Sequence, residues 1–311
     1  MAENAPQTLR IASRESQLAL AQSEWVVETL NNLYPDCKID IVGMTTKGDQ
    51  ILDKPLAQIG GKGLFIKELE VAMEQGRADI AVHSMKDVPM TLPPGFAMTI
   101  VGEREDVHDA FVSNLYESPA DMPPGAIVGT SSLRRESQLR HHYPALRVAC
   151  LRGNVNTRLR KLDESEFDAI ILASAGLIRL GLQERIRTRL MQNEFLPAIA
   201  QGALGIEYRA DRTDLAAWLA PLNNPETTAT VEAERALGRA LAASCDIPLG
   251  AHARIQNGQL KLEGFVALPD GTRMIREHLI GRRDDPEALG RALAEKLLAR
   301  GAGEILATLA A

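Results

Sequence analysis

The stretch Ala126-Ile127-Val128-Gly129-Thr130-Ser131-Ser132-Leu133-Arg134-Arg135 places an apolar run directly before small polar residues and two arginines. The stretch Leu151-Arg152-Gly153-Asn154-Val155-Asn156-Thr157-Arg158 follows residues 147–150 in the same way. Each pattern predicts a strand that runs into polar residues and then a helix. Hydroxyl groups, backbone N–H groups and guanidinium groups then gather at strand ends, where an α/β sheet builds an anion site.

The composition limits what that anion can be. The 311 residues carry a net charge of −6, so a local cationic pocket points to a small polyanionic ligand rather than a long nucleic acid. An aromatic content of 4% also argues against nucleic-acid binding. A hydrophobic content of 45% and a charged content of 24% are ordinary for a globular protein of two or three domains.

The sequence pattern predicts neither a secretory signal nor a membrane span. The first residues have no basic and apolar leader, and no run approaches the length of a membrane span. The three cysteines, Cys37, Cys150 and Cys245, are too widely spaced for a disulfide framework or a zinc pattern. We therefore expect a cytoplasmic protein without a metal site or a membrane partner.

Strand and helix patterns alternate over the first two-thirds of the chain, which predicts parallel sheets covered by helices on both faces. The expected strands are residues 9–12, 39–44, 79–82 and 97–101, then 126–128, 147–150 and 167–173. The expected helices are residues 16–33 and 64–74, then two that start near residues 133 and 155. Two similar α/β units are indicated, each with a Pro-Pro-Gly turn before a strand.

The pattern changes after residue 223. A helix over residues 228–243 precedes two strands, residues 259–268 and 272–280, that are joined by the turn Pro269-Asp270-Gly271. Asn257-Gly258 is a second hairpin signal, and a helix over residues 286–298 and a shorter one close the chain. This predicts a small α+β third domain. Residues 195–206 lie before it and could return the chain to the first domain.

A second polar cluster follows the predicted strand over residues 79–82. His83-Ser84-Met85-Lys86-Asp87 places a hydroxyl, a cation and a carboxylate at a strand's carboxyl end, where open α/β sheets bind ligands. Asp87 is a candidate general acid–base or a partner for a developing cation. The structural alternative is that Asp87 caps a turn before Val88-Pro89 and that Lys86 is solvated.

Arg14 stands just after the first predicted strand, where Ser13 or Ser16 can cap the following helix. A cation so close to a helix N-terminus is disfavoured unless an anion binds there. The alternative is a surface ion pair between Arg14 and Glu15.

Two further segments carry candidate residues. Gly60-Gly61-Lys62-Gly63-Leu64-Phe65 lacks the spacing of a phosphate-binding P-loop and reads as a mobile lid or as a simple flexible loop. Cys245 follows the helix of the third domain and is either a nucleophile, an attachment point or a buried small hydrophobe. Cys150, inside a strand pattern, is expected to be buried.

Together these segments resemble the hydroxymethylbilane synthase family, also called porphobilinogen deaminases. The resemblance runs in order through nearly the whole chain. The matching segments are residues 10–14, 60–65, 83–89, 129–135, 151–155, 157–158, 168–173, 201–207 and 245–250. One departure is that Ala243-Ser244 stands before Cys245, where the family is expected to have two glycines.

The resemblance implies a transferase of porphyrin and heme biosynthesis that condenses four porphobilinogen molecules head to tail into linear hydroxymethylbilane and releases ammonia. A dipyrromethane cofactor, one per chain, primes the reaction from a thioether to a cysteine, here Cys245. The resemblance makes Asp87 the catalytic carboxylate and places Lys62 and Phe65 on a lid. It makes these residues binders of the cofactor and substrate: Arg14, Ser16, Ser84, Lys86, Thr130, Ser131, Ser132, Arg134, Arg135, Arg152, Gly153, Arg158 and Gln201.

The residues suit this chemistry. Every pyrrole of the growing chain carries two carboxylates, which a cluster of cations can hold. Loss of ammonia leaves a cationic electrophile that a nearby carboxylate can stabilise.

The resemblance also implies a fold of two lobes like those of periplasmic binding proteins, with mixed, mainly parallel sheets, plus the α+β domain. We expect domain 1 over residues 1–102 and 203–222, domain 2 over residues 103–202, and domain 3 over residues 223–311. A monomer with porphobilinogen as its ligand is expected. The alternatives from other classes are a non-catalytic anion receptor and a nucleic-acid binder that uses Arg134 and Arg135.

Overall fold

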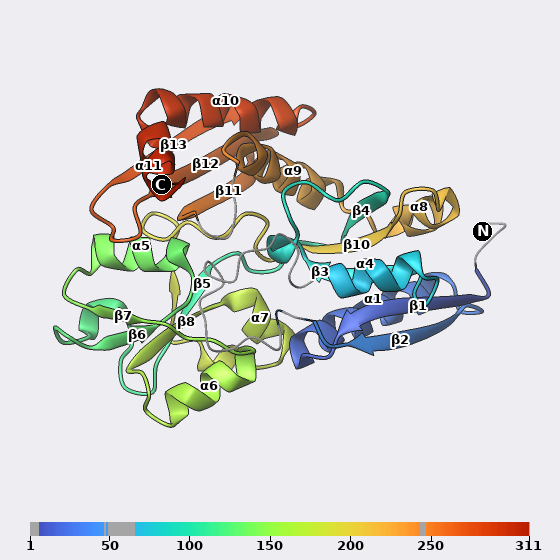
Figure 1. Cartoon of the computed structure of the whole chain (residues 1–311), viewed down its shortest axis with the longest axis horizontal. Helices are drawn as coiled ribbons and strands as arrows, with labels where there is room; N and C mark the ends of the chain where they lie inside the picture. Colours follow the sequence, from blue (N-terminus) through green and yellow to red (C-terminus); the bar gives the residue numbers. More distant parts are fainter. Residues whose placement is uncertain (1–5, 47, 49–65, 243–246, 311) are drawn as a thin grey trace. The chain divides into compact units, whose positions relative to one another are not determined.

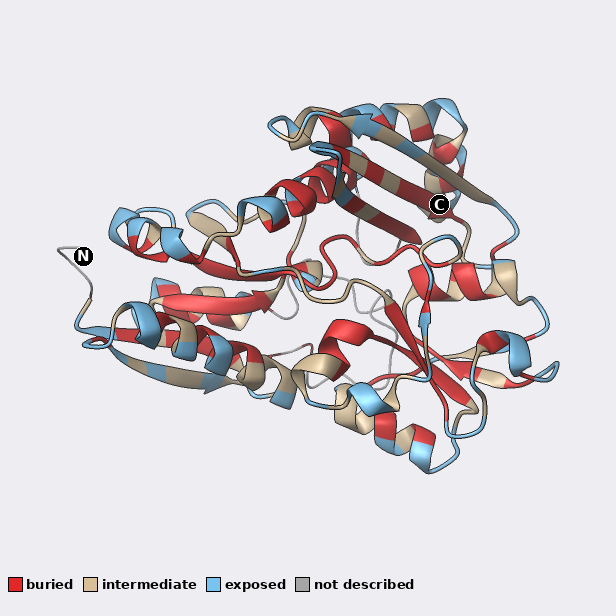
Figure 2. Cartoon of the chain, turned by 180° about the vertical axis from the view of Figure 1, so that it is seen from behind, coloured by how far each residue is buried: buried red, intermediate tan, exposed pale blue. Residues whose placement is uncertain are grey.

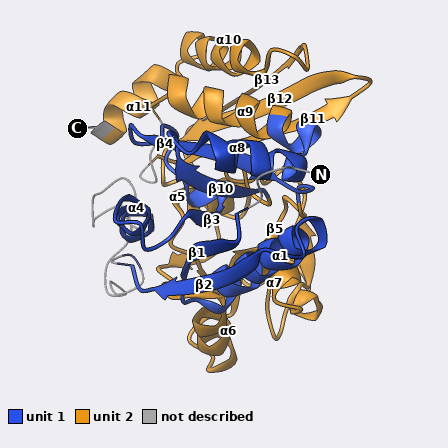
Figure 3. Cartoon of the chain, turned by 90° about the vertical axis from the view of Figure 1, so that its right-hand side faces the viewer, with its two compact units in different colours: residues 1–51, 61–104, 203–228 blue, residues 52–60, 105–202, 229–311 orange. Residues whose placement is uncertain are grey.

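The computed structural model describes residues 6–46, 48, 66–242 and 247–310, and the chain separates into two compact units. Unit 1 comprises residues 1–51, 61–104 and 203–228, and unit 2 comprises residues 52–60, 105–202 and 229–311 (Figure 3). Figure 1 labels their helices and strands. In the described part of the chain, no helix is both long and apolar enough to cross a membrane.

Unit 1 is built on a five-stranded sheet with the order β2-β1-β3-β10-β4. Its strands are β1 (Thr8–Arg14), β2 (Lys38–Met44), β3 (Ile80–Ser84), β4 (Phe96–Val101) and β10 (Leu204–Arg209). Its helices are α1 (Gln17–Leu33), α4 (Lys67–Glu74) and α8 (Thr213–Leu219), with the 3₁₀ turn η1 (Met85–Asp87) after β3. β1 is parallel to β2 and β3, whereas β10 is antiparallel to both of its neighbours.

The sheet of unit 1 is covered on both faces. Leu30 of α1 and Trp218 of α8 pack with Ile11 and Ile206 on one face, whereas Leu69 of α4 packs with Ala12 and other small residues on the opposite face. The burial of the central strands is visible as red ribbon in Figure 2. Burial on both faces explains why the central strand β3 begins with the apolar run Ile80-Ala81-Val82.

Unit 2 contains a second five-stranded sheet, with the order β7-β6-β8-β5-β9. Its strands are β5 (Asp109–Val112), β6 (Ile127–Gly129), β7 (Arg147–Ala149), β8 (Ala169–Ala173) and β9 (Thr188–Leu190). Its helices are α5 (Leu133–His142), α6 (Val155–Asp163) and α7 (Ser174–Arg179). Leu139 of α5 packs on one face with Phe111 and Val128, and Leu159 of α6 packs on the other with Ile170.

The two sheets share one topology. In each, three parallel strands are followed by an antiparallel fourth strand and a fifth strand that pairs antiparallel with the fourth. In these two sheets, the strands that the sequence patterns did not single out are β5, β9 and β10. The prediction of two α/β parts with mixed, mainly parallel sheets is confirmed.

The remainder of unit 2 is the predicted α+β part. Helix α9 (Pro225–Ala240) is followed by an antiparallel sheet of β11 (Leu249–Gln256), β12 (Gln259–Ala267) and β13 (Met274–Gly281). Helices α10 (Pro286–Ala299) and α11 (Ala302–Ala310) close the chain. The turn from β11 to β12 has positive φ at Asn257 (52°) and Gly258 (76°), as a two-residue hairpin loop requires.

Helices α7 and α8 have no counterpart among the expected elements, and two expectations need correction. Helix α9 begins at Pro225 rather than at residue 228, because Pro is well suited to a first helical turn. The prediction that Cys150 is buried is wrong, because β7 ends at Ala149 and Cys150 lies exposed in the loop that follows. The exact boundaries of the three predicted domains stay a prediction.

Gly290 of α10 provides a test of this packing. A Cβ atom there would stand 2.5 Å from the carbonyl oxygen of Ala233 and 2.5 Å from Cβ of Ala236, both on α9. Gly290→Ala should therefore force the helices apart and lower the free energy of unfolding by about 1–3 kcal/mol, measured by urea denaturation. Gly303→Ala on α11 is the control, because its nearest neighbour would be Leu298 at 3.7 Å. That variant should gain up to about 1 kcal/mol, and equal effects at both sites would contradict the packing argument.

Candidate active site

Polar side chains collect at the carboxyl edge of the sheet in unit 1. β1 and β3 are parallel neighbours, so their carboxyl ends meet at one edge. Arg14 is the last residue of β1, and Ser84 is the last residue of β3. The turn η1 follows directly and carries half-buried Lys86 and exposed Asp87. The structure therefore brings together the candidates that the sequence placed after these two strands.

Two serines of this edge are engaged in local structure. The Ser16 hydroxyl caps α1 by accepting a hydrogen bond from the backbone N–H of Ala19 (3.3 Å). The Ser84 hydroxyl accepts from the Gln22 amide of α1 (2.8 Å). Glu15 accepts a hydrogen bond from Thr45 (2.5 Å). Within the described residues, the Asp87 carboxylate has no hydrogen-bond or ion-pair partner, and so it does not cap the following turn.

The carboxyl edge of the sheet in unit 2 carries the second set of candidates. β6 and β7 are parallel neighbours, and Thr130 continues their pairing through a backbone hydrogen bond to Ala149 (2.9 Å). Ser132 caps α5 by accepting from the backbone N–H of Arg135 (3.4 Å), while Ser131 is half-buried beside it. The run of hydroxyl residues therefore marks the start of α5, where helix N–H groups favour an anion.

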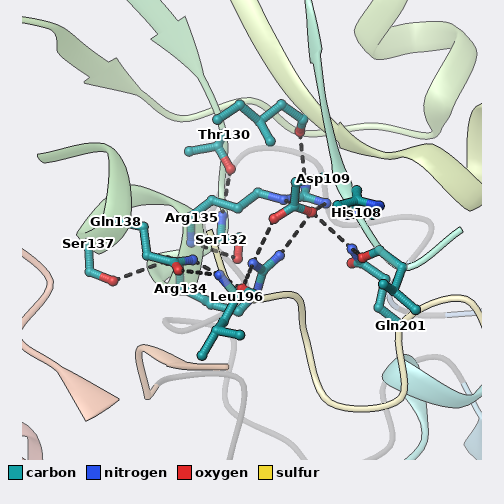
Figure 4. A network of polar contacts seen from close by, with 12 residues as sticks. His108, Asp109, Thr130, Ser132, Arg134, Arg135, Ser137, Gln138, Leu196 and Gln201 are labelled. Carbon is teal, nitrogen blue, oxygen red and sulfur yellow. Dashed lines mark hydrogen bonds and ion pairs between the residues drawn. The ribbon is translucent and has the colours of Figure 1, made fainter. Parts of the chain in front are cut away.

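Arg134 and Arg135, by contrast, turn into the interior, where one carboxylate holds both (Figure 4). Arg134 makes a two-pronged contact with Asp109, at 2.7 Å to Oδ2 and 3.1 Å to Oδ1. Arg135 donates to Oδ1 of the same residue from Nε (3.1 Å) and Nη2 (2.8 Å). Both guanidinium groups also donate to backbone carbonyls, Arg134 to Leu196 (2.6 Å) and Arg135 to Ile171 (3.0 Å).

The electrostatics of this cluster favour the ionised carboxylate. Asp109 is completely buried, which raises the pKa of its carboxyl, but the charges and hydrogen bonds of Arg134 and Arg135 outweigh burial and hold that pKa well below its usual value. Burial lowers the pKa of Arg134, and Asp109 opposes that shift. Two cations share one anion, so the cluster keeps a net positive charge.

Gln201 ties a third segment to the cluster. Its side-chain amide donates to the Asp109 carboxylate (3.1 Å) and to the Val107 carbonyl (2.7 Å). The preceding Ala200 has a positive φ of 59°, and its backbone N–H donates to the buried carboxylate of Glu234 on α9 (2.6 Å). A second donation to Glu234, from the N–H of Ala253 (2.7 Å), joins β11 to the same helix.

The loop after β7 positions the remaining arginines. Arg152 is buried, and burial lowers its pKa. Gly153 has φ of +118°, and a Cβ there would lie 2.7 Å from Thr157 Cγ2, so only glycine fits this turn. Its carbonyl accepts from Arg158 Nε (2.8 Å), and Asn154 then caps α6.

Asp109 is the site residue that the sequence reasoning missed. A signal was present, because a carboxylate opens the apolar run Asp109-Ala110-Phe111-Val112, and a buried carboxylate requires partners. The sequence patterns predicted that Arg134 and Arg135 donate hydrogen bonds only to a ligand. In the structure, both also donate to Asp109. Lys62, Phe65 and Cys245 lie outside the described residues. Among the described ones, no group of three or more His, Cys, Asp or Glu could hold a metal ion.

These features define an α/β protein with cations and hydroxyls at the carboxyl edges of its sheets, where α/β proteins commonly bind anions. The family model "Porphobilinogen deaminase, dipyromethane cofactor binding domain" matches residues 9–217, and "Porphobilinogen deaminase, C-terminal domain" matches residues 228–299. The chain belongs to the porphobilinogen deaminase family. This confirms the predicted resemblance and an enzyme rather than a receptor.

Curated relatives agree over the full length. The porphobilinogen deaminase of Thiobacillus denitrificans is 61% identical over 304 residues, which covers 98% of this chain and 99% of that protein. The porphobilinogen deaminase of Methylobacillus flagellatus is 60% identical over 306 residues, with 98% and 99% covered. Among solved structures, the methionine-binding protein MetQ has a TM-score of 0.45 at 12% identity, with 72% of this chain and 93% of that chain covered.

Asp109→Asn tests whether the buried carboxylate organises unit 2. The variant keeps the side-chain shape but leaves two buried guanidinium groups without their counter-charge. The free energy of unfolding should fall by about 3–5 kcal/mol in urea denaturation at pH 7. Asp163→Asn is the matched control: that carboxylate pairs with Arg185 at the surface and is 48% exposed. Its loss should stay within about 1 kcal/mol, and a comparably small effect of Asp109→Asn would contradict the proposed role.

Proposed function

We propose that this chain condenses porphobilinogen into linear hydroxymethylbilane, with Asp87 as its catalytic carboxylate and Cys245 as the attachment point of a dipyrromethane. The observation that carries the proposal is the chemistry of the two strand-end clusters. One offers an exposed carboxylate beside a lysine, and the other offers buried guanidinium groups beside the hydroxyl residues that open α5. Membership of the porphobilinogen deaminase family supplies the reaction.

The donor set fits a dipyrromethane, whose pyrrole rings carry acidic side chains. Arg134 and Arg135 have more N–H donors than they use in their hydrogen bonds to Asp109, Leu196 and Ile171. Arg152, Arg158 and the N–H groups at Gly153 add donors at the next strand end. When bound, the cofactor supplies the pyrrole carbon to which the first substrate molecule is joined.

Asp109 prepares the arginines for such a ligand. Because the guanidinium groups are already fixed in place, binding a carboxylate requires little further ordering of their long side chains. The remaining candidates, Arg14, Ser16, Ser84, Lys86, Thr130, Ser131, Ser132 and Gln201, are proposed to hold the side chains of the substrate and of the growing product.

Asp87 is proposed to act on the substrate nitrogen. When ammonia leaves porphobilinogen, positive charge develops on the pyrrole, and an adjacent carboxylate stabilises that charge. The same carboxylate can accept the pyrrole N–H and take up a proton when the new carbon–carbon bond forms. The exposure of Asp87 leaves its oxygens open to a ligand.

We further propose that the protein works in the cytoplasm as a monomer on a small-molecule substrate, without nucleic-acid or membrane partners. The net charge of −6 and the three widely spaced cysteines support this setting.

The attachment residue is tested by the mass of the denatured protein. Purified protein should carry the added mass of one dipyrromethane, and peptide mapping should locate it on Cys245. Cys245→Ser should lack the added mass, whereas Cys150→Ser, at an exposed thiol, should retain it. Active enzyme with a free Cys245, or with the group on Cys37 or Cys150, would overturn the assignment.

Asp87→Asn tests the catalytic carboxylate. The change keeps the size of the side chain and removes its charge, so turnover should fall about a hundredfold or more. Folding and the attached mass should persist, which separates a chemical defect from a structural one. Asp36→Asn is the control in the same unit, because Asp36 is exposed and stands before β2, at the opposite end of the parallel strands from Asp87. Normal turnover by Asp87→Asn would remove Asp87 from the mechanism.

A further inference from the structure

Two polar residues interrupt the apolar layer between α4 and the sheet of unit 1. In this layer Leu69, Ala72 and Met73 of α4 pack against Ala12 and Ala81 of the sheet. Because Glu207 pairs with Ala81 and His83 lies two residues further along β3, all three face α4. His83 is 5% exposed and Glu207 is 0% exposed. A carboxylate this deeply buried must be compensated by partners.

Glu207 has a partner on each side. Its Oε2 lies 2.9 Å from Nε2 of His83. From the helix side, the carboxyl of Glu70 on α4 lies close enough to Glu207 for a hydrogen bond between them when one of the two is protonated. The two buried oxygens that remain, Oε1 of Glu70 and Oε1 of Glu207, receive no donor from the described residues. Two carboxyl groups therefore meet in this layer, Glu207 fully buried and Glu70 half-buried, which is costly if both are ionised and favourable if they share a proton.

We infer that Glu70 and Glu207 share one proton, and that the chain Glu70–Glu207–His83 is a positioning device for the segment Ser84–Asp87. In this arrangement the Glu70 O–H donates to one oxygen of Glu207, and the His83 Nε2–H donates to the other. This satisfies both buried oxygens and ties α4, β10 and β3 together. The positioning role rests on the proposed function of Asp87, whereas the shared proton does not.

The positioned segment lies directly after His83. Ser84 ends β3, and the backbone N–H of Met85 donates to the carbonyl of Ala203 (3.0 Å), next to the first residue of β10. Met85 also packs on Gly205 of β10, where a Cβ would stand 2.3 Å from its sulfur. The segment is therefore fixed by contacts with Ala203, just before β10, and with Gly205 of β10. The contact between Glu207 and His83 is a third link between β10 and β3. Displacement of β3 would move Lys86 and Asp87 with it.

The surroundings of Glu70 set the pH at which the proton is lost. Glu74 and Lys67 lie on the same helix as Glu70. Glu207 and His83 face that helix from the sheet. Arg10 and Arg14 lie on the same face of β1 as Ala12, because each is two residues away from it. Arg10 is paired with Asp79. Burial, followed by the charges of Glu207 and Glu74, raises the pKa of Glu70 to about 7, and Lys67 opposes the shift.

The sign of the effect on stability follows from this shift. The pKa of Glu70 is higher in the folded chain than in the unfolded chain, where it is about 4.3. The stabilisation is therefore complete below that value and is lost as the pH rises through about 7. Glu70→Gln keeps a donor toward Glu207 at every pH and should not show this loss.

The shared proton is tested without any activity measurement. In protein labelled with ¹³C at the glutamate carboxyls, the resonance that Glu70→Gln removes should titrate near pH 7. In Glu207→Gln the same resonance should titrate at a lower pH than in the wild type, because the contribution of the Glu207 charge is lost while that of burial remains. The melting temperature of Glu70→Gln relative to that of the wild type should be higher at pH 8.5 than at pH 5. Glu28→Gln, at an exposed site on α1, should show no such divergence. A normal titration of Glu70, or parallel melting curves, would overturn the inference.

The positioning role is tested by comparing Glu70→Gln with Glu70→Ala at pH 7. The Gln variant should retain kcat, whereas the Ala variant should lose about tenfold in kcat with little change in KM, because the reacting groups are displaced. Rescue by Gln but not by Ala distinguishes positioning from a loss of charge. If both variants turn over normally while Glu70 titrates near pH 7, the shared proton stands and the positioning role is overturned. A wild-type protein inactive on porphobilinogen would instead contradict the proposed function.

Discussion

The ion pair of Asp109 with Arg134 and Arg135 is the interaction on which the site in unit 2 depends. A buried carboxylate and two buried guanidinium groups are each unfavourable alone, and they are tolerated because they satisfy one another. The contact fixes the first turn of α5, and through Leu196 and Gln201 it fixes the segment that leads to β10. Because one anion serves two cations, the cluster stays positive. The residues that satisfy one another in the interior are therefore also those that we propose to hold an acidic ligand.

The two five-stranded sheets have the same arrangement of polar residues. Each carries its candidate site residues at the carboxyl ends of parallel strands, and each has a buried carboxylate on the antiparallel fourth strand, Glu207 on β10 and Asp109 on β5. In each case the carboxylate bonds to a residue at or next to a strand end, His83 or the arginines of α5. The difference lies in charge. Arginine partners keep Asp109 ionised, whereas Glu70 brings a second carboxyl and with it a proton near neutrality.

Much of the fold could be predicted because local patterns agree with the tertiary structure. Ser16 and Ser132 cap the helices that follow them, and Asn257-Gly258 forms the hairpin turn. The strands missed in the two five-stranded sheets, β5, β9 and β10, have partners that lie far away in the sequence. Cys150 was misplaced because a strand pattern does not reveal its last paired residue, and β7 ends one residue earlier.

The sequence by itself determined the α/β class, the family and the segments that carry the candidate site, because these depend on residue types at fixed spacing. Only the tertiary structure decided the partners of the buried charges. Asp109 lies 25 residues from Arg134, and Glu207 lies 124 residues from His83, so no periodicity along the chain links them. A buried charge requires a partner, but which residue supplies it is set by the order of strands in the sheet and by the helix packed above them.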